Sequence, residues 1–221
     1  MVYIKTPIDI SNVGRLKRTV AYILDEAKTM EIEVNGLHTF PLVVKNGDLQ
    51  TQLISGHLIA SEYQAAEEFI LTKKLADQRM GRTEKSDLVT GKGILAKHLI
   101  QSFSPDDKLS PEEIHEIGRK TMLEFTGGKY EFVIATHVDK DHIHNHIILN
   151  TTNTSTLKKI RWQKNTLQRL KQISDRHADL AGAKIIDNSG PKFSHTQYAA
   201  YRKQNVHKVE IKERLNFLIK H

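Results

Sequence analysis

The stretch that decides the fold is residues 131–150, which read EFVIATHVDKDHIHNHIILN. Two runs rich in β-branched and other apolar residues, 131–137 and 143–150, are separated by a short polar segment containing two aspartates and a lysine. Runs of this length with so short a polar connection are typical of an antiparallel hairpin. We therefore expect two paired strands joined by a turn.

The hairpin is rich in histidine. Four of the twelve histidines of the chain fall within it, namely His137, His142, His144 and His146. A turn over residues 139–142 places His137 directly opposite His144, where cross-strand Cβ atoms are about 4.5–5.5 Å apart. His146 lies two residues beyond His144 and therefore points to the same face. The spacing predicts three imidazoles on one side of a sheet.

Such a cluster suits a metal ion, because rigid strands hold the ligands in place. Three protein ligands leave coordination positions open, which is typical of a catalytic site. Imidazole ligands accept zinc, nickel or manganese. Asp139 and Asp141 in the turn are placed to accept the second ring N–H of a liganding histidine. His142 falls in the turn, either as a neighbour of the ligands or as a substitute ligand. The alternative is a chance cluster on a solvated strand, which three facing histidines make weak.

The composition describes a basic globular chain. Its 221 residues are 38% hydrophobic and 27% charged, with a net charge of +7. That length is sufficient to bury a core, and the charge favours a polyanionic partner, although solubility alone would permit it. The absence of cysteine excludes disulfide frameworks, thiolate metal sites and cysteine nucleophiles. With no membrane-length apolar run and no signal-peptide pattern, we expect a cytoplasmic protein without membrane insertion.

The rest of the chain predicts a mixed α+β fold. Helical spacing follows Ser11 over residues 11–29, and further helices are expected over 62–75, 110–126 and 163–181. The third begins with a capping box, Ser110-Pro111-Glu112-Glu113, and ends at Gly127-Gly128. Strands are expected over 2–6, 98–103 and 183–186, a loop or short strand over 38–44, and a loop over 79–93. We predict one domain over residues 1–190 and a basic helical tail over 191–221 whose unterminated helical spacing suits a piece of a longer protein.

Tyr22 lies off the apolar stripe of the first predicted helix. At 100° per residue it falls roughly 150° from the centre of that stripe. Arg15 and Arg18 share its polar face, about two turns and one turn earlier. A phenol beside two guanidiniums is suited to meet a phosphate, because arginine binds phosphate bidentately. Taken by itself, the helix pattern favours the alternative, which is an ordinary surface tyrosine beside ordinary surface charges.

A second group of cationic residues follows the hairpin. The segment there contains Lys158, Arg161 and Trp162. A tryptophan among cations suits single-stranded DNA, through base stacking together with phosphate neutralisation. A tryptophan that covers the edge of the core would explain the same residues equally well.

In this order the motifs resemble those of conjugative relaxases of the MOB-P type, within the HUH endonuclease superfamily. Residues 137–146, followed by IILN, are similar to their third motif, especially in the VirD-like and Gram-positive plasmid or conjugative-element groups. Tyr22 in RTVAYI (residues 18–23) resembles the nucleophile of their first motif. Ser102 in HLIQSF (residues 98–103) resembles the serine of the middle motif, which lies beside bound DNA. The resemblance spans residues 1 to about 190.

The resemblance implies a central antiparallel β-sheet flanked by helices, an HUH relaxase-like palm. It implies a divalent metal, Mn²⁺ or Mg²⁺, held by His137, His144 and His146. The implied reaction cleaves and rejoins one strand at the nic site of an origin of transfer through a 5′-phosphotyrosyl link to Tyr22. Asp139 would take the tyrosine proton or orient His137. The implied partners are single-stranded origin-of-transfer DNA, a relaxosome accessory protein and a type IV coupling protein.

Three other functions remain open at this stage. One is another HUH nuclease, a rolling-circle replication initiator or a transposase, in which the tyrosine commonly follows the histidine motif. The second is a non-catalytic DNA-binding accessory protein with a structural histidine cluster. The third is a metal-dependent hydrolase that uses water.

Overall fold

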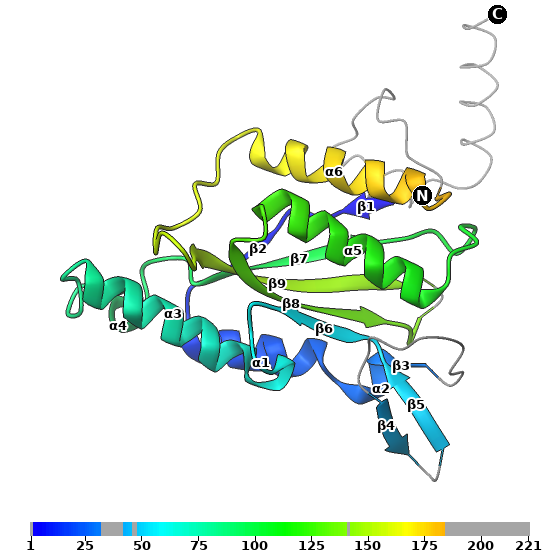
Figure 1. Cartoon of the computed structure of the whole chain (residues 1–221), viewed down its shortest axis with the longest axis horizontal. Coiled ribbons are helices and arrows are strands. Elements are labelled where there is room, and N and C mark those ends of the chain that lie inside the picture. The colour runs from blue at the N-terminus through cyan, green and yellow to red at the C-terminus, as the bar shows by residue number, and fades with distance from the viewer. Residues whose placement is uncertain (1, 32–41, 46–47, 141, 184–221) are drawn as a thin grey trace, which may run out of the picture. The chain divides into compact units, whose positions relative to one another are not determined.

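The computed structural model describes residues 2–31, 42–45, 48–140 and 142–183 (Figure 1). They form a six-stranded antiparallel sheet with helices on both faces, and a smaller three-stranded sheet. The predicted α+β class is therefore confirmed. The basic tail predicted over 191–221 lies outside the described residues, as does the strand predicted over 183–186 from residue 184 on.

The large sheet places the histidine hairpin at its centre. Its order is β1 (Tyr3–Ile4), β7 (Ala96–Ser102), β9 (His144–Asn153), β8 (Tyr130–His137) and β6 (Ile54–His57), with β2 (Ile8–Ile10) also paired with β7. Every pairing is antiparallel. The strand β9 is thus flanked by β7 on one side and β8 on the other.

The small sheet was not predicted as such. It consists of β3 (Met30–Glu31), β5 (Asp48–Gln52) and β4 (Leu42–Lys45), in that order. The sequence indicated only a loop or short strand over 38–44, of which 38–41 lie outside the described residues. The segments DLQTQ and ISGH of β5 and β6 have too few apolar residues to show a strand pattern.

One face of the large sheet is covered by α1 (Val13–Ile23) and α3 (Ala65–Arg79), drawn below the sheet in Figure 1. Leu16, Val20 and Ile23 are the buried residues of α1. Together with Phe69 of α3 they pack in one core with Val133, Ala135 and Ile148 of the sheet. The polar side of α1, which includes Tyr22, is thereby left toward solvent.

The opposite face is covered by α5 (Pro111–Thr126) and α6 (Thr166–Leu180), drawn above the sheet in Figure 1. The capping box at Ser110 and Glu113 forms as predicted. Gly127 and Gly128 end α5 with φ values of 62° and 66°, a region that glycine enters without steric cost. Met122 and Phe125 of α5 pack with Phe132 and Ile134 of β8 in this second core.

Several predicted helix boundaries were wrong. The first helix is capped by Asn12 rather than Ser11, and Asp25 caps a separate short helix, α2 (Glu26–Thr29). A 3₁₀ turn, η1 (Glu62–Gln64), precedes α3, and α6 begins at Thr166 rather than Gln163. The loop predicted over 79–93 contains α4 (Asp87–Thr90). No helix in the described ranges combines the length and the apolar character that a membrane crossing requires.

Candidate active site

The three histidines meet as predicted. In the register of β8 and β9, His137 is paired with His144 and Ala135 with His146. One potential ligand atom from each of His137, His144 and His146 lies within 4.8 Å of the other two. His137 and His146 are buried, with 1% and 5% of their surface exposed, and His144 is partly exposed. Of the three rings, that of His144 is therefore the one that solvent reaches most readily.

Backbone carbonyls fix the protonation of two of the rings. The Nε2 of His137 lies 2.9 Å from the carbonyl oxygen of Ile23, and the Nδ1 of His144 lies 2.9 Å from that of His142. A carbonyl oxygen can only accept, so each of these nitrogens carries the proton. The other nitrogen of each neutral ring then holds the lone pair that a metal ion requires. His142 thus contributes its backbone to the site.

The third ring is oriented by a histidine that the sequence did not single out. The Nε2 of His98 on β7 lies 2.8 Å from the Nδ1 of His146. Burial lowers the pKa of His98 to about 4 and that of His146 to about 2, so both rings are neutral at pH 7. A metal on the Nε2 of His146 leaves its proton on Nδ1, and His98 then accepts that proton's hydrogen bond.

A weak signal for His98 was present in the strand predicted over 98–103. Alternation places His98, Ile100 and Ser102 on one face of that strand. The register of β7 with β9 then sets Ile100 beside His146 and Ser102 beside His144. The pairing of two strands so far apart in the chain is not written in either strand, which is why His98 was missed.

Tyr22 packs against the histidines. Its ring centroid lies 5.9 Å from those of His137 and His146, edge-on to both. Lys28 Nζ lies 3.9 Å from the centroid of the tyrosine ring and 3.0 Å from the carboxylate of Asp25. Tyr22 remains 48% exposed. The phenol is thus held beside the three imidazoles and stays within reach of a large substrate.

The other residues predicted for this end of the sheet lie around the cluster. Ser102 is partly exposed opposite His144. Arg15 and Arg18 are exposed on α1, and the charge of Arg15 contributes to the lowered pKa of His98.

The aspartates of the turn lie beside the histidines in sequence. Asp139 is exposed just beyond β8. Burial is the main cause of the lowered pKa of His137, and the charge of Asp139 opposes that lowering. Asp141 lies outside the described residues.

The segment of Lys158, Arg161 and Trp162 lies elsewhere. Its backbone is bonded to the far end of β9, where Asn153 N–H donates to the carbonyl of Lys158. Asn153 is seven residues along the strand from His146 and nine from His144, which at 3.3 Å per residue is about 23–30 Å. Trp162 is half-buried and packs edge-on against Phe125, with Lys97 Nζ 4.4 Å from the tryptophan ring centroid. The fold does not bring these residues to the histidine cluster.

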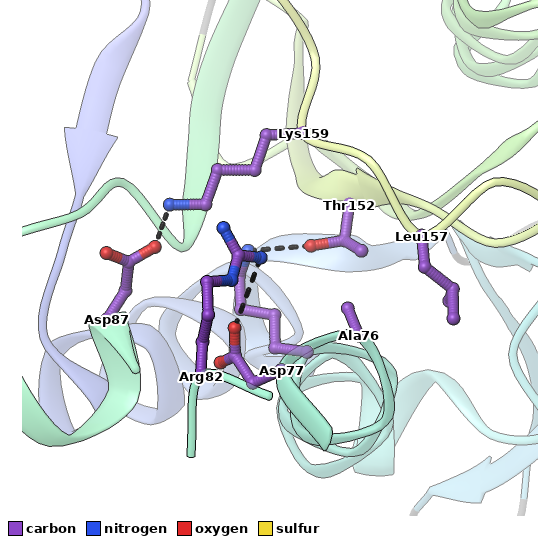
Figure 2. A pocket seen from close by; sticks show the side chains of 8 residues that line it. Ala76, Asp77, Arg82, Asp87, Thr152, Leu157 and Lys159 are labelled. Atoms are coloured by element: carbon purple, nitrogen blue, oxygen red, sulfur yellow. Dashed lines mark hydrogen bonds and ion pairs between the residues drawn. The ribbon is translucent and has the colours of Figure 1, made fainter. Parts of the chain in front are cut away.

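Figure 2 shows a small pocket at this far end, where Lys159 pairs with Asp87 and Arg82 with Asp77. Lys73 is buried there and donates to the hydroxyls of Thr151 and Thr152, at 3.0 and 2.8 Å. Burial lowers the pKa of Lys73 to about 7. The pocket volume is about 10 Å³, room for about one water molecule. This cluster of paired charges is therefore too small to take a nucleotide.

On the face of the sheet opposite the histidines, polar side chains form a continuous hydrogen-bonded chain. It runs through Ser55, His115, Thr136, Asn145, Gln101 and Ser174, with bond lengths of 2.6 to 2.9 Å. Burial lowers the pKa of His115 to about 3, which keeps the ring neutral. The Thr136 hydroxyl donates to Asn145 Oδ1 and therefore accepts from Nδ1 of His115. Along this series of hydrogen bonds, each residue then donates to the next, from Ser55 to Ser174.

The histidine cluster can bind a metal ion. Its potential ligands are three imidazoles. On His137 and His144 the hydrogen bond to a carbonyl leaves the other ring nitrogen for a metal ion, and on His146 the Nε2 is left when Nδ1 donates to His98. This donor set leaves coordination positions for a substrate oxygen. A phenol at the edge of such a cluster is a candidate nucleophile for a phosphoryl group.

Comparison with known proteins agrees with this arrangement. Residues 22–182 match the family model of the relaxase MobA/VirD2-like nuclease domain. The group II intron-interrupted relaxase LtrB of Lactococcus lactis subsp. cremoris is 43% identical over 249 aligned positions, which cover 99% of this chain and 44% of that protein. Protein rlx of Staphylococcus aureus is 31% identical over 105 positions, covering 48% of this chain and 33% of that protein. The chain thus spans less than half the length of these relatives. It belongs to the MobA/VirD2-like relaxase family, whose nuclease domain it contains.

Proposed function

We propose that this chain is the strand-cutting domain of a conjugative relaxase, which cleaves and rejoins one DNA strand at the nic site of an origin of transfer. The observation that carries the proposal is the packing of Tyr22 against His137 and His146, at 5.9 Å each. A structural histidine cluster has no need of a half-exposed phenol at its edge. The family match supports a relaxase over a rolling-circle initiator or a transposase.

In the proposed reaction, the Oη of Tyr22 attacks the scissile phosphorus and the bond from phosphorus to O3′ breaks. The products are a 5′-phosphotyrosyl link and a free 3′-hydroxyl, and the reverse attack rejoins the strand. A phenol with a pKa near 10 needs a base to lose its proton at pH 7. Asp139 is the proposed acceptor of that proton. Its other candidate role, orienting His137, is already filled by the Ile23 carbonyl, which accepts the ring proton of His137.

His137, His144 and His146 would hold a divalent metal, Mn²⁺ or Mg²⁺. Bound there, the ion would polarise the phosphoryl oxygens and offset the charge that develops during attack. The protein supplies the fixed geometry: His98 and the carbonyls of Ile23 and His142 set which nitrogen of each ring faces the ion's site. Lys28, above the ring of Tyr22, is a further cation available to the phosphate.

The single strand would approach along the exposed side of α1. Arg15 and Arg18 are proposed to contact its phosphates near the cut, and Ser102 to lie beside it. Lys158, Arg161 and Trp162 belong to a separate stretch about 25 Å away, some four to seven nucleotides along an extended strand. The relaxosome accessory protein and the coupling protein are proposed partners of the full-length protein.

Covalent capture tests the proposal. The chain is incubated with Mn²⁺ and a single-stranded oligonucleotide that spans the origin of the encoding element, then denatured and separated by size. A DNA-linked protein band is expected, and peptide mapping should find the DNA on Tyr22. Tyr22→Phe should abolish the band, because only the attacking oxygen is removed, while metal binding measured by calorimetry is retained.

The alternatives give different products in the same assay. A hydrolase that uses water yields cut DNA without an adduct, and an accessory protein yields neither. An adduct mapped to Tyr63 or Tyr130 would retain the nuclease function and reject Tyr22 as its nucleophile.

A further inference from the structure

A second cavity opens beside the helix that carries Tyr22. It has a volume of about 310 Å³ and lies between α1 and the start of α3. Val20, Ala21 and Leu24 form its wall on α1, and Tyr63, Ala66 and Glu67 its wall on the other side, with Lys17 and Glu26 completing the lining. This volume falls in the range of about 300–1,000 Å³ typical of sites that bind small organic groups.

Tyr63 gives the cavity a fixed aromatic surface. The side chain is 56% exposed, yet its hydroxyl donates to Oε1 of Gln52 at 2.5 Å. Gln52 itself is buried. Burial of the hydroxyl, with smaller contributions from Glu26 and Glu62, raises the pKa of Tyr63. The ring is therefore anchored at its polar end while much of its surface stays uncovered, as a stacking platform requires.

The same anchor ties the cavity to the nucleophile's segment. Nε2 of Gln52 donates to the carbonyl of Leu24 and to the hydroxyl of Thr29, each at 3.1 Å. Leu24 directly follows Ile23, whose carbonyl accepts from His137. The aromatic surface, the end of α1 and the histidine cluster are thus connected by three hydrogen bonds and the peptide unit between Ile23 and Leu24.

The charges in the cavity select among parts of a nucleotide. Lys17 pairs with Glu67 at 2.8 Å, which neutralises both. Glu26 is exposed, and within the described ranges no ion pair engages its carboxylate. A carboxylate repels a phosphate but accepts hydrogen bonds from exocyclic amino groups, as it does from N4 of cytosine. The cavity therefore suits a base rather than the DNA backbone.

We propose that this cavity takes one unstacked base of the single strand, stacked on Tyr63 and recognised through its amino group by Glu26. The inference rests on the proposed function and adds a determinant of which sequence is cut. Thymine, which has no exocyclic amino group, is the base that it disfavours.

Homopolymers test the inference without knowledge of the origin sequence, because every register presents the same base. The probes are fluorescein-labelled (dC)₁₂ and (dT)₁₂, and the readout is the dissociation constant from fluorescence anisotropy. The protein should bind (dC)₁₂ about tenfold more tightly than (dT)₁₂. Tyr63→Ala should weaken binding of (dC)₁₂ by roughly 5- to 100-fold, the loss expected for one stacked base. Tyr63→Phe should retain most of it.

Glu26→Gln should bring the ratio of the two dissociation constants to about one. It is an exposed residue, so the test does not depend on tolerance of a core change. Leu71→Ala is the control for lost apolar surface, because Leu71 is as exposed as Tyr63, at 56%, and lies outside the cavity. An unchanged ratio in Glu26→Gln, or unchanged (dC)₁₂ binding in Tyr63→Ala, overturns the inference while the Tyr22 adduct upholds the proposed function. Failure of the unmodified protein to bind either oligonucleotide also overturns the inference, whereas the proposed function is decided by the Tyr22 adduct on origin DNA.

Discussion

The two faces of the large sheet use buried polar groups in opposite ways. Along β9, His144 and His146 point to the α1 face, and Asn145 between them points to the α5 face. Asn145 accepts from Thr136 and donates to both Gln101 and the carbonyl of Ile114. On the α1 face three histidines converge, and the carbonyl hydrogen bonds of His137 and His144 leave a lone pair on the second nitrogen of each ring.

The difference shows how a closed network can be told from a site. When each buried donor meets an acceptor, the arrangement stabilises the fold and leaves no group for a ligand. When several acceptor groups converge and cannot all bond one another, the lone pairs that remain can be used by a bound ion or a water molecule. By this criterion the α5 face is structural and the α1 face is the proposed site, although the two sets alternate along one strand.

The largest effect expected is on metal binding in His144→Ala. Loss of one of three ligands should weaken metal affinity by more than 100-fold, beyond the 10- to 100-fold typical of residues behind the ligands. The free energy of unfolding without metal should change by less than about 1 kcal/mol, because His144 is partly exposed and the hydrogen bond of its ring is to the carbonyl of nearby His142. Calorimetric titration and urea denaturation measure the two quantities. Unchanged metal affinity would show that His144 is not a ligand.

The adjacent replacement Asn145→Ala should do the reverse. It leaves the buried Thr136 hydroxyl and Gln101 amide without their partner, at a cost of about 2–3 kcal/mol in the free energy of unfolding. Metal affinity of the folded fraction should change only a few-fold. A variant that loses metal binding as severely as His144→Ala, with no loss of stability, would mean that the two faces are not separate.

His98→Leu tests a residue that is neither a proposed ligand nor part of the structural network on the α5 face. It removes the acceptor that holds the Nδ1 proton of His146, so metal affinity should fall by about 10- to 100-fold. His98→Gln is the matched variant, since its side-chain oxygen can accept the same bond and should recover part of the loss. Equal metal affinities in both variants and the unmodified protein would remove His98 from the site.

The smallest effect concerns Lys73, in the charged cluster at the far end of β9. Its pKa is about 7 when folded and 10.5 in the unfolded chain, so over that interval the unfolded state binds more protons. Stability should therefore rise with pH between about 7 and 10, by about 2 kcal/mol from pH 7 to pH 9, and this contribution should be absent in Lys73→Met. Urea midpoints at pH 7 and pH 9 measure it. Parallel changes in the two proteins would show that Lys73 does not titrate as proposed.

The sequence predicted those parts of the molecule that depend on neighbouring residues. The hairpin register that pairs His137 with His144, and the capping box of α5, both follow from spacings of a few residues and were confirmed. It did not predict β5 and β6, whose polar strands are specified by their sheet partners. His98 and Lys28 belong to the site only through contacts across the fold, with His146 and Tyr22 respectively. Long-range pairing of this kind leaves no periodic pattern in a single segment.

The position of β9 has a consequence for how the chain folds. It is the last strand of the described sheet in chain order, yet it lies between β7 and β8. During synthesis, β7 and β8 therefore emerge with their inner edges unpaired, and unpaired edges invite association with other chains. Since the proposed ligands His144 and His146 are on the strand that closes this gap, the histidine cluster and the sheet are completed in the same step. A newly made chain therefore cannot assemble the histidine cluster before the exposed edges of β7 and β8 are paired.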